Sequence, residues 1–168
     1  VEYKNGNEAY IKQLPCNISL YKYCGHWQAD EGNSNTYVSH WNTAYVEVDF
    51  TGKHVYIEFS KPSKIKVSID GGSFTKYDNA NGNMKFEAAF DGKHTIRIQN
   101  IGTFQDHVYF AGASVPKGQT LSRTADKEHY IQFIGDSISA DGRSHAHNSA
   151  NLLGWDYSVV AKGAMSLQ

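Results

Sequence analysis

The chain has 168 residues, a formal net charge of −1 at pH 7, and a composition that is 40% hydrophobic and 13% aromatic. This apolar content can bury one good core and a small second one, so we expect a globular protein. The weak charge and the lack of a basic run argue against nucleic acid as a partner, and apolar runs far shorter than the ~20 residues of a membrane helix argue against a membrane.

Two cysteines, Cys16 and Cys24, lie near the N-terminus. Their number and spacing do not suit a four-ligand zinc site, which leaves a disulfide or two free thiols. We predict a disulfide between them, which would stabilise the fold by about 2.5 kcal/mol if its geometry is unstrained. No cluster of carboxylates, histidines or cysteines elsewhere completes a metal site, so we expect no metal and no cofactor.

Apolar and polar residues alternate between residues 45 and 115 with the period of two that predicts half-buried antiparallel strands. The apolar positions are Val46, Val48 and Phe50, then Val55, Ile57 and Phe59, then Ile65, Val67 and Ile69. Separators rich in glycine and asparagine predict hairpin turns between these strands. They are Thr51-Gly52-Lys53, Asp70-Gly71-Gly72, residues 79–83 and Asp91-Gly92-Lys93. Seven or so short strands with regular turns favour a jelly-roll β-sandwich.

Two of the tryptophans are candidates for contact with sugars. Trp41 comes just before a predicted strand, and because aromatic side chains in a sandwich are more often part of the core, we expect it there. Trp27 lies in a loop-like stretch and is the better candidate for an exposed platform. The polar segment after residue 117 is a predicted linker. We therefore divide the chain into a sandwich domain (1–117), a linker (118–128) and a second unit (129–168).

A short apolar strand, residues 130–134, runs into Gly135-Asp136-Ser137. Glycine permits a tight turn off the strand, and the backbone N–H groups that follow can point at an oxyanion next to the serine. Ser137 is therefore a candidate nucleophile. Asp136 is interpreted as a turn residue that braces the serine loop by local hydrogen bonds.

A second apolar strand, residues 157–162, ends on Gly163, about 26 residues after Ser137, and this spacing suits a β-α-β unit. A glycine that merely ends a strand is the other interpretation. Gly135-Asp136-Ser137 resembles the first motif of the SGNH, or GDSL, hydrolases. The resemblance implies that the N–H groups of Ser137 and Gly163 together form the oxyanion hole.

The β-rich segment ahead of this motif, with residues 40–52 and 90–98, extends the resemblance to carbohydrate esterase family 2. In that family an N-terminal jelly roll is joined to an SGNH catalytic domain. The resemblance implies a mainly β chain with a partial α/β, flavodoxin-like segment at its end. It also implies removal of acetyl groups from plant cell-wall polysaccharides such as xylan or mannan, outside the cell, through a serine acyl-enzyme.

The same resemblance implies a histidine base in a late Asp-x-x-His motif and an oxyanion asparagine in Gly-x-Asn-Asp, and neither motif follows Ser137. Two Asp-x-x-His matches, residues 91–94 and 126–129, precede the serine, and their hairpin and linker contexts disfavour them as the base. Residues 144–153 can supply only a short helix, and we expect His145 and His147 to form a solvent-facing loop pair without a metal.

Three hypotheses follow from these patterns. The leading one is a polysaccharide acetyl esterase represented by its sandwich and the front of its catalytic domain, inactive alone, which would act on an acetylated polysaccharide or oligosaccharide. The alternative is a carbohydrate-binding sandwich without catalysis. The third is a hydrolase whose remaining catalytic part is a separate chain. Because two parallel strands alone would leave apolar faces and unpaired edges exposed, we expect the chain to be a fragment.

Overall fold

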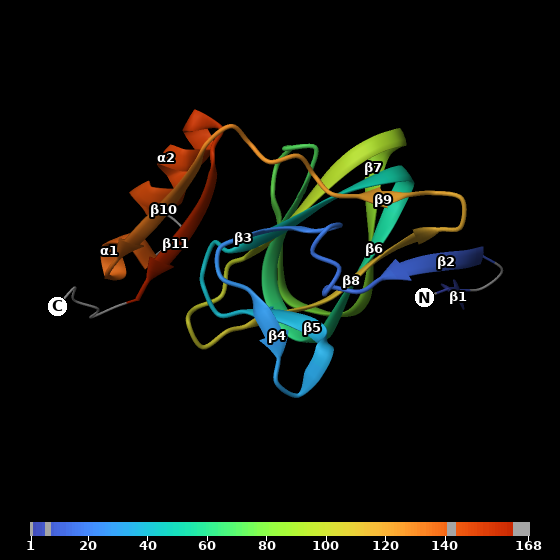
Figure 1. Ribbon diagram of the computed structural model, residues 1–168, viewed down its shortest axis with the longest axis horizontal. Helices are drawn as coiled ribbons and strands as arrows, with labels where there is room; N and C mark the ends of the chain where they lie inside the picture. Colours follow the sequence, from blue (N-terminus) through green and yellow to red (C-terminus); the bar gives the residue numbers. More distant parts are fainter. Residues whose placement is uncertain (1, 6–7, 141–143, 163–168) are drawn as a thin grey trace.

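The computed structural model describes residues 2–5, 8–140 and 144–162. Nine strands form one curled antiparallel sheet, which we call the sandwich, and two further strands with two helices form what we call the β10–β11 unit (Figure 1). The sandwich strands are β1 (Glu2–Asn5), β2 (Glu8–Gln13), β3 (Lys22–Cys24), β4 (Gln28–Asp30), β5 (Asn33–Ser39), β6 (Tyr45–Ile69), β7 (Thr75–Asn100), β8 (Val108–Pro116) and β9 (Leu121–Ser122). The unit contains β10 (Tyr130–Gly135), α1 (Ser137–Ala140), α2 (His145–Leu153) and β11 (Asp156–Ala161). The predicted mainly β fold class is confirmed, and the partial α/β segment is shown in part, as two parallel strands with two helices.

The long strands β6 and β7 bend where the sequence predicts several hairpin turns. Only Asp70-Gly71-Gly72 is a turn, with Asp70 and Gly71 at positive φ. Gly52 and Gly92 instead face each other across the β6–β7 pair, and the register shifts directly after Gly52. Glycine permits a bulge as readily as a turn, so the same residues let both strands curl without ending them.

The core of the sandwich is built from the alternating apolar residues that the sequence identifies. Val46, Val48 and Phe50 are at most 1% exposed, and so are Val55, Ile57 and Phe59 on the next part of β6. They pack against the inward side chains of β7 and β8 in one contiguous cluster. β9 pairs with β6, so the segment predicted to be a linker begins within the sheet.

In the β10–β11 unit the two strands are parallel, as the β-α-β spacing predicts, with Tyr130 opposite Asp156. Helix α2 covers one face through Ala146 and Ala150, which are at most 1% exposed. His147 is also buried, next to Tyr157, so the predicted solvent-facing histidine pair is wrong for that residue. Helix α2 begins at His145, and His147 is two residues further along. On a helix that spacing places the two side chains on different faces, so His147 points toward the strands while His145 is exposed.

Other apolar side chains of the unit face outward. Tyr130, Ile134 and Ile138 are 57%, 56% and 71% exposed, and Leu152 is 88% exposed. The exposure of Tyr130 and Ile134, both on β10, is what a pair of parallel strands leaves when helices cover only one of its faces. No helix in the described part of the chain is long and apolar enough to span a membrane.

The predicted disulfide between Cys16 and Cys24 is not formed in the structure, where both residues are free thiols. Cys16 is exposed, whereas Cys24 on β3 is buried among Tyr45, Tyr157 and other residues of the second core cluster. β3 directs the Cys24 side chain into the interface between the sandwich and the β10–β11 unit, so the thiol acts as a small apolar core residue.

Candidate functional site

Ser137 is exposed at the first position of α1, directly after β10. A Cβ at Gly135 would lie 2.6 Å from the Ser139 side-chain oxygen, so the tight turn requires glycine there. Asp136 Oδ1 accepts a hydrogen bond of 3.0 Å from the Ile138 N–H, and the Asp136 carbonyl accepts from Ser139 and Ala140. The predicted bracing role of Asp136 is therefore confirmed.

The serine lines a cavity of about 460 Å³ between the two parts of the molecule. The sandwich contributes His40, Trp41 and Phe104 to its wall, and the β10–β11 unit contributes Ser137, Ala140 and Lys162. Cavities of this size are typical of sites for small ligands. Gly163, the predicted second oxyanion residue, lies outside the described residues.

Two loops of the sandwich carry the aromatic wall. We call residues 40–44, between β5 and β6, the tryptophan loop, and residues 101–106, after β7, the phenylalanine loop. Asn100, which is fully buried, fixes both. Its backbone bonds to Thr43 and Ala44 are 2.9 Å each, its side-chain amide donates to the Ser39 carbonyl, and its Oδ1 accepts from the Gly102 N–H at 2.7 Å.

The phenylalanine loop has further anchors of its own. Asp106 accepts hydrogen bonds from the N–H and hydroxyl of Thr103 and pairs with Lys64 at 3.0 Å. The bond from Lys64, followed by those from Thr103, lowers the pKa of Asp106 to about 2. A Cβ at Gly102 would come within 2.4 Å of the Asp106 side chain, so the loop closes tightly on itself. Phe104 is therefore held at a fixed place on the cavity wall.

The aromatic rings at the cavity meet at defined angles. Trp41 and Phe104 are arranged edge to face, with ring centroids 5.5 Å apart, and the Lys162 ammonium lies 4.6 Å from the centre of the Phe104 ring. His40 stands beside His107, with ring centroids 3.8 Å apart. Burial, with smaller effects from His107 and His26, lowers the pKa of His40, so its imidazole is neutral at pH 7.

This placement corrects the expectation for Trp41, which is only partly buried and lines the cavity instead of joining the core. Trp27 is also partly buried: it packs against the sandwich core, donates to the Cys24 carbonyl at 3.2 Å and lines a separate groove. Trp41 follows Ser39, where β5 ends, and the strand alternation resumes only at Tyr45. That break in the pattern, with His40 and Asn42 on either side, is the signal that identifies a loop.

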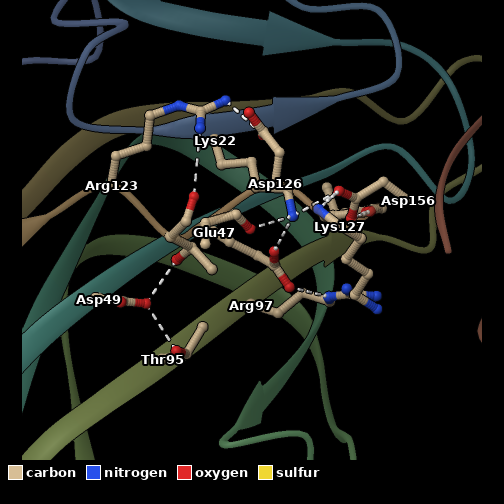
Figure 2. A network of polar contacts seen from close by, with 12 residues as sticks. Lys22, Glu47, Asp49, Thr95, Arg97, Arg123, Asp126, Lys127 and Asp156 are labelled. Carbon is tan, nitrogen blue, oxygen red and sulfur yellow. Dashed lines mark hydrogen bonds and ion pairs between the residues drawn. The ribbon is translucent and has the colours of Figure 1, made fainter. Parts of the chain in front are cut away.

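At the other end of β11, a buried charge network joins the two parts of the molecule (Figure 2). The Lys22 side chain is 2% exposed, and its Nζ lies 2.7 Å from Asp156 and 3.3 Å from Glu47. The same ammonium donates to the Ala125 carbonyl at 3.0 Å. Arg97, whose side chain is 13% exposed, pairs with Glu47 at 2.7 Å, so two cations face two buried carboxylates.

Asp156, the first residue of β11, receives two more hydrogen bonds. They come from the Tyr45 hydroxyl at 2.8 Å and the Lys127 N–H at 2.9 Å. Burial by itself would raise the pKa of Asp156, but the bonds from Lys22, Lys127 and Tyr45 outweigh it and hold the pKa below its usual value. The network therefore fixes the start of β11 on the sandwich, and with it the direction in which β10 and β11 reach the cavity.

The other histidines considered from the sequence do not line the cavity of Ser137. His94 is buried in the sandwich, with its ring nitrogens 2.7 Å from Asp70 and 3.0 Å from the Phe90 carbonyl. His129 packs its ring against Trp155, and His145 is exposed at the start of α2. Within the described ranges, no group of three histidine, cysteine or carboxylate side chains could hold a metal ion.

Comparison with known proteins gives a family for most of the sandwich. Residues 28–124 match the family model described as carbohydrate esterase 2 N-terminal. This range contains both cavity loops and ends just after β9, whereas Ser137 lies beyond it. No curated protein matches the sequence.

Solved structures share the fold over most of the chain. A family two carbohydrate esterase from Cellvibrio japonicus superposes with a TM-score of 0.74 at 15% identity, covering 94% of this chain and 53% of that one. An acetyl xylan esterase from Butyrivibrio proteoclasticus gives 0.71 at 16% identity, covering 94% and 49%. A family two carbohydrate esterase from Clostridium thermocellum, in complex with cellohexaose, gives 0.70 at 17%, covering 87% and 52%. The chain thus spans about half the length of these structures.

Proposed function

The chain belongs to the carbohydrate esterase 2 N-terminal family, and from this premise we propose that it contributes to a serine esterase that removes O-acetyl groups from plant cell-wall polysaccharide such as xylan or mannan. The observation that supports the proposal most directly is the position of Ser137. It is exposed after a tight turn and lines a cavity whose other wall is aromatic. A nucleophile on one wall and apolar ring surfaces on the other suit an ester carried by a sugar.

In the proposed reaction, Ser137 Oγ attacks the acetyl carbonyl carbon while its proton passes to a histidine base. The N–H groups of Ser137 and Gly163 stabilise the oxyanion of the tetrahedral intermediate. Its collapse breaks the bond to the sugar oxygen, which takes up the proton, and leaves an acetyl-enzyme that water then hydrolyses. We place the base outside residues 1–168, in the remainder of a catalytic domain on the same or a second polypeptide.

Substitution of the serine tests this function in the full-length protein. Ser137→Ala should abolish the release of acetate from acetylated xylan or mannan, because no other group replaces the nucleophile. Ser139→Ala is the matched control, since Ser139 lies on the same turn but does not line the cavity. Acetate release that persists in Ser137→Ala would refute Ser137 as the nucleophile, whereas loss in both variants would indicate damage to the turn.

A second candidate function is carbohydrate binding without hydrolysis. A groove on the sandwich is lined by Tyr23, Trp27 and Tyr37, with Tyr23 at ring distances of 5.4 Å and 5.3 Å from the other two. Partly exposed aromatic rings of this kind can stack on sugars, and the Clostridium thermocellum relative is in complex with cellohexaose. Binding of cello-, xylo- or manno-oligosaccharides by a protein that releases no acetate would favour this function.

The site of action follows from the proposed substrate. Plant cell-wall polysaccharides are too large to enter a cell, so we propose that the protein is secreted and meets acetylated polysaccharide or oligosaccharide outside it. Detection of the protein in the culture medium of its source, with a cytoplasmic enzyme as the control for lysis, tests this proposal. Retention of the protein inside intact cells would contradict it.

A further inference from the structure

The tryptophan loop contains an uncommon backbone conformation. Thr43 has a φ of 70°, in the left-handed region that β-branched residues rarely adopt. The residue is 2% exposed, and its N–H bond to Asn100 helps to hold it there. Surrounding structure must impose such a conformation, and residues of this kind gather at ligand sites. Its consequence here is local, because Trp41 and Asn42, which precede it, both line the cavity.

Asn42 carries a hydrogen-bond acceptor without a partner. Its side-chain amide donates to the Gly102 carbonyl at 3.0 Å, whereas its Oδ1 is buried and accepts no hydrogen bond from the described residues. Buried polar atoms in folded proteins nearly always have a partner. Asn42 lines the cavity, so a small shift of its side chain that exposes Oδ1 would let a hydroxyl group of a ligand supply the missing donor.

Trp41 and Phe104 give the same wall its apolar character. Their rings meet edge to face and so form a corner in which two aromatic surfaces are close together. Aromatic faces carry partial negative charge, and the C–H groups on the face of a pyranose ring carry partial positive charge. A sugar ring therefore matches this wall, with its C–H face toward the rings and its hydroxyl groups toward Asn42. A purely aliphatic acyl chain would leave the Asn42 acceptor unpaired.

We propose that the tryptophan and phenylalanine loops of the sandwich bind the sugar ring that bears the ester, opposite Ser137 across the shared cavity. The inference rests on the proposed function, since it takes an O-acetylated sugar as the ligand. In this arrangement the β10–β11 unit supplies the nucleophile and the sandwich supplies recognition of the pyranose. Trp41, Asn42 and Phe104 are the residues that determine whether a sugar ester is preferred over a simple ester.

The test compares two substrates in the full-length protein. For each variant, kcat/KM is measured with an acetylated xylo- or manno-oligosaccharide and with 4-nitrophenyl acetate, which has no sugar. Trp41→Ala and Phe104→Ala should lower the ratio of the two values by about tenfold or more, mainly by raising KM for the oligosaccharide. Phe74→Ala is the matched control, because Phe74 has a similar exposure of 40% against 44% and likewise lies under a lysine, Lys66, at 4.4 Å.

An unchanged ratio in both Trp41→Ala and Phe104→Ala would overturn the inference, as would an equal fall in Phe74→Ala. If the wild-type protein hydrolyses neither substrate, the proposed function fails, and calorimetric binding of the unmodified oligosaccharides decides the inference separately. Binding that is lost in Trp41→Ala but kept in Phe74→Ala would then support the loops as a sugar site. Absent binding, or binding kept in Trp41→Ala and Phe104→Ala, would overturn it.

Discussion

The two ends of the interface between the sandwich and the β10–β11 unit are built differently. At the start of β11, Lys22, Glu47 and Asp156 are almost fully buried and Arg97 is partly buried, and each is matched by a group of opposite charge. At the far end, the interface opens into the cavity of Ser137, where Asn42 Oδ1 has no partner among the described residues and Thr43 is strained. The first, which we call the closed end, holds two parts of the molecule together, and the second, which we call the open end, keeps groups that the proposed sugar would complete.

This contrast shows why a cavity formed between two units needs a rigid contact between them at some distance from the cavity itself. The cavity walls come from separate elements, so their spacing depends on how the units are docked. A network in which every charge has a partner allows one docking geometry, because any displacement would leave a charge unpaired. The open end can then keep unsatisfied groups without letting the walls close on each other.

Removal of Lys22, the cation at the centre of the closed end, should have the largest effect on stability. Lys22→Met leaves Asp156 and Glu47 buried without their shared lysine, and we expect a loss of about 3–5 kcal/mol in the free energy of unfolding, measured by chemical denaturation. The control is Lys61→Met, whose exposed pair with Asp30 at 3.2 Å should contribute no more than about 1 kcal/mol. Equal effects in the two variants would contradict a special role for the network.

The buried thiol between the two ends reports on opening of the interface. Burial raises the pKa of Cys24 to about 11, whereas Cys16 is exposed, so alkylation at pH 8 should modify Cys16 quickly and Cys24 only when the units separate. In Lys22→Met, alkylation of Cys24 should accelerate by about 10²-fold, as measured by mass spectrometry. Equal rates at the two cysteines, or the absence of any free thiol, would contradict this arrangement.

Acid should weaken the closed end, because the pKa of Asp156 determines how the free energy of unfolding changes with pH. Because its pKa lies below the ordinary value of 3.8 in the folded protein, the unfolded chain binds the proton first as the pH falls. The stabilisation is therefore complete above that value and is lost as the pH drops through the lower folded pKa. Asp156→Asn removes this contribution, so the stability curves of the variant and the wild type should converge as the pH falls below the ordinary value of 3.8. A constant difference below that pH would refute the assignment.

The smallest expected change in stability concerns Thr43 at the open end. Thr43→Gly relieves the left-handed strain and removes a buried hydroxyl that has no hydrogen-bond partner within the described ranges, so the free energy of unfolding should stay the same or rise by up to about 1 kcal/mol. Ala44→Gly, at the next buried residue, should instead lower it by about 1 kcal/mol or more. Thermal unfolding of both variants measures the contrast, and a large loss in Thr43→Gly would show that the threonine stabilises the loop.

Local patterns in the sequence predicted the parts of the site that depend on neighbouring residues. The turn at Ser137 and the parallel pairing of β10 with β11 follow from a short apolar strand, Gly135 and a spacing along the chain. The cavity wall could not be predicted in this way, because Trp41 and Phe104 are more than 60 residues apart in the sequence and are brought together by long-range bonds from Asn100 and Asn42. The bends in β6 and β7 also could not be predicted from the sequence, since glycine supports a bulge and a hairpin equally well.

The bonding of Asn100 has a consequence for how the protein can evolve. All four of its hydrogen-bonding groups hold the bases of the two loops, and the residue does not itself line the cavity. The side chains of Trp41 and Phe104 are therefore separable from the frame that supports them, whereas Asn42 also bonds the Gly102 carbonyl of the other loop. If the loops bind the sugar as proposed, mutations at Trp41 and Phe104 can change which glycan is accepted while the serine turn stays intact, so these two positions are a natural target for a library that seeks new sugar specificity.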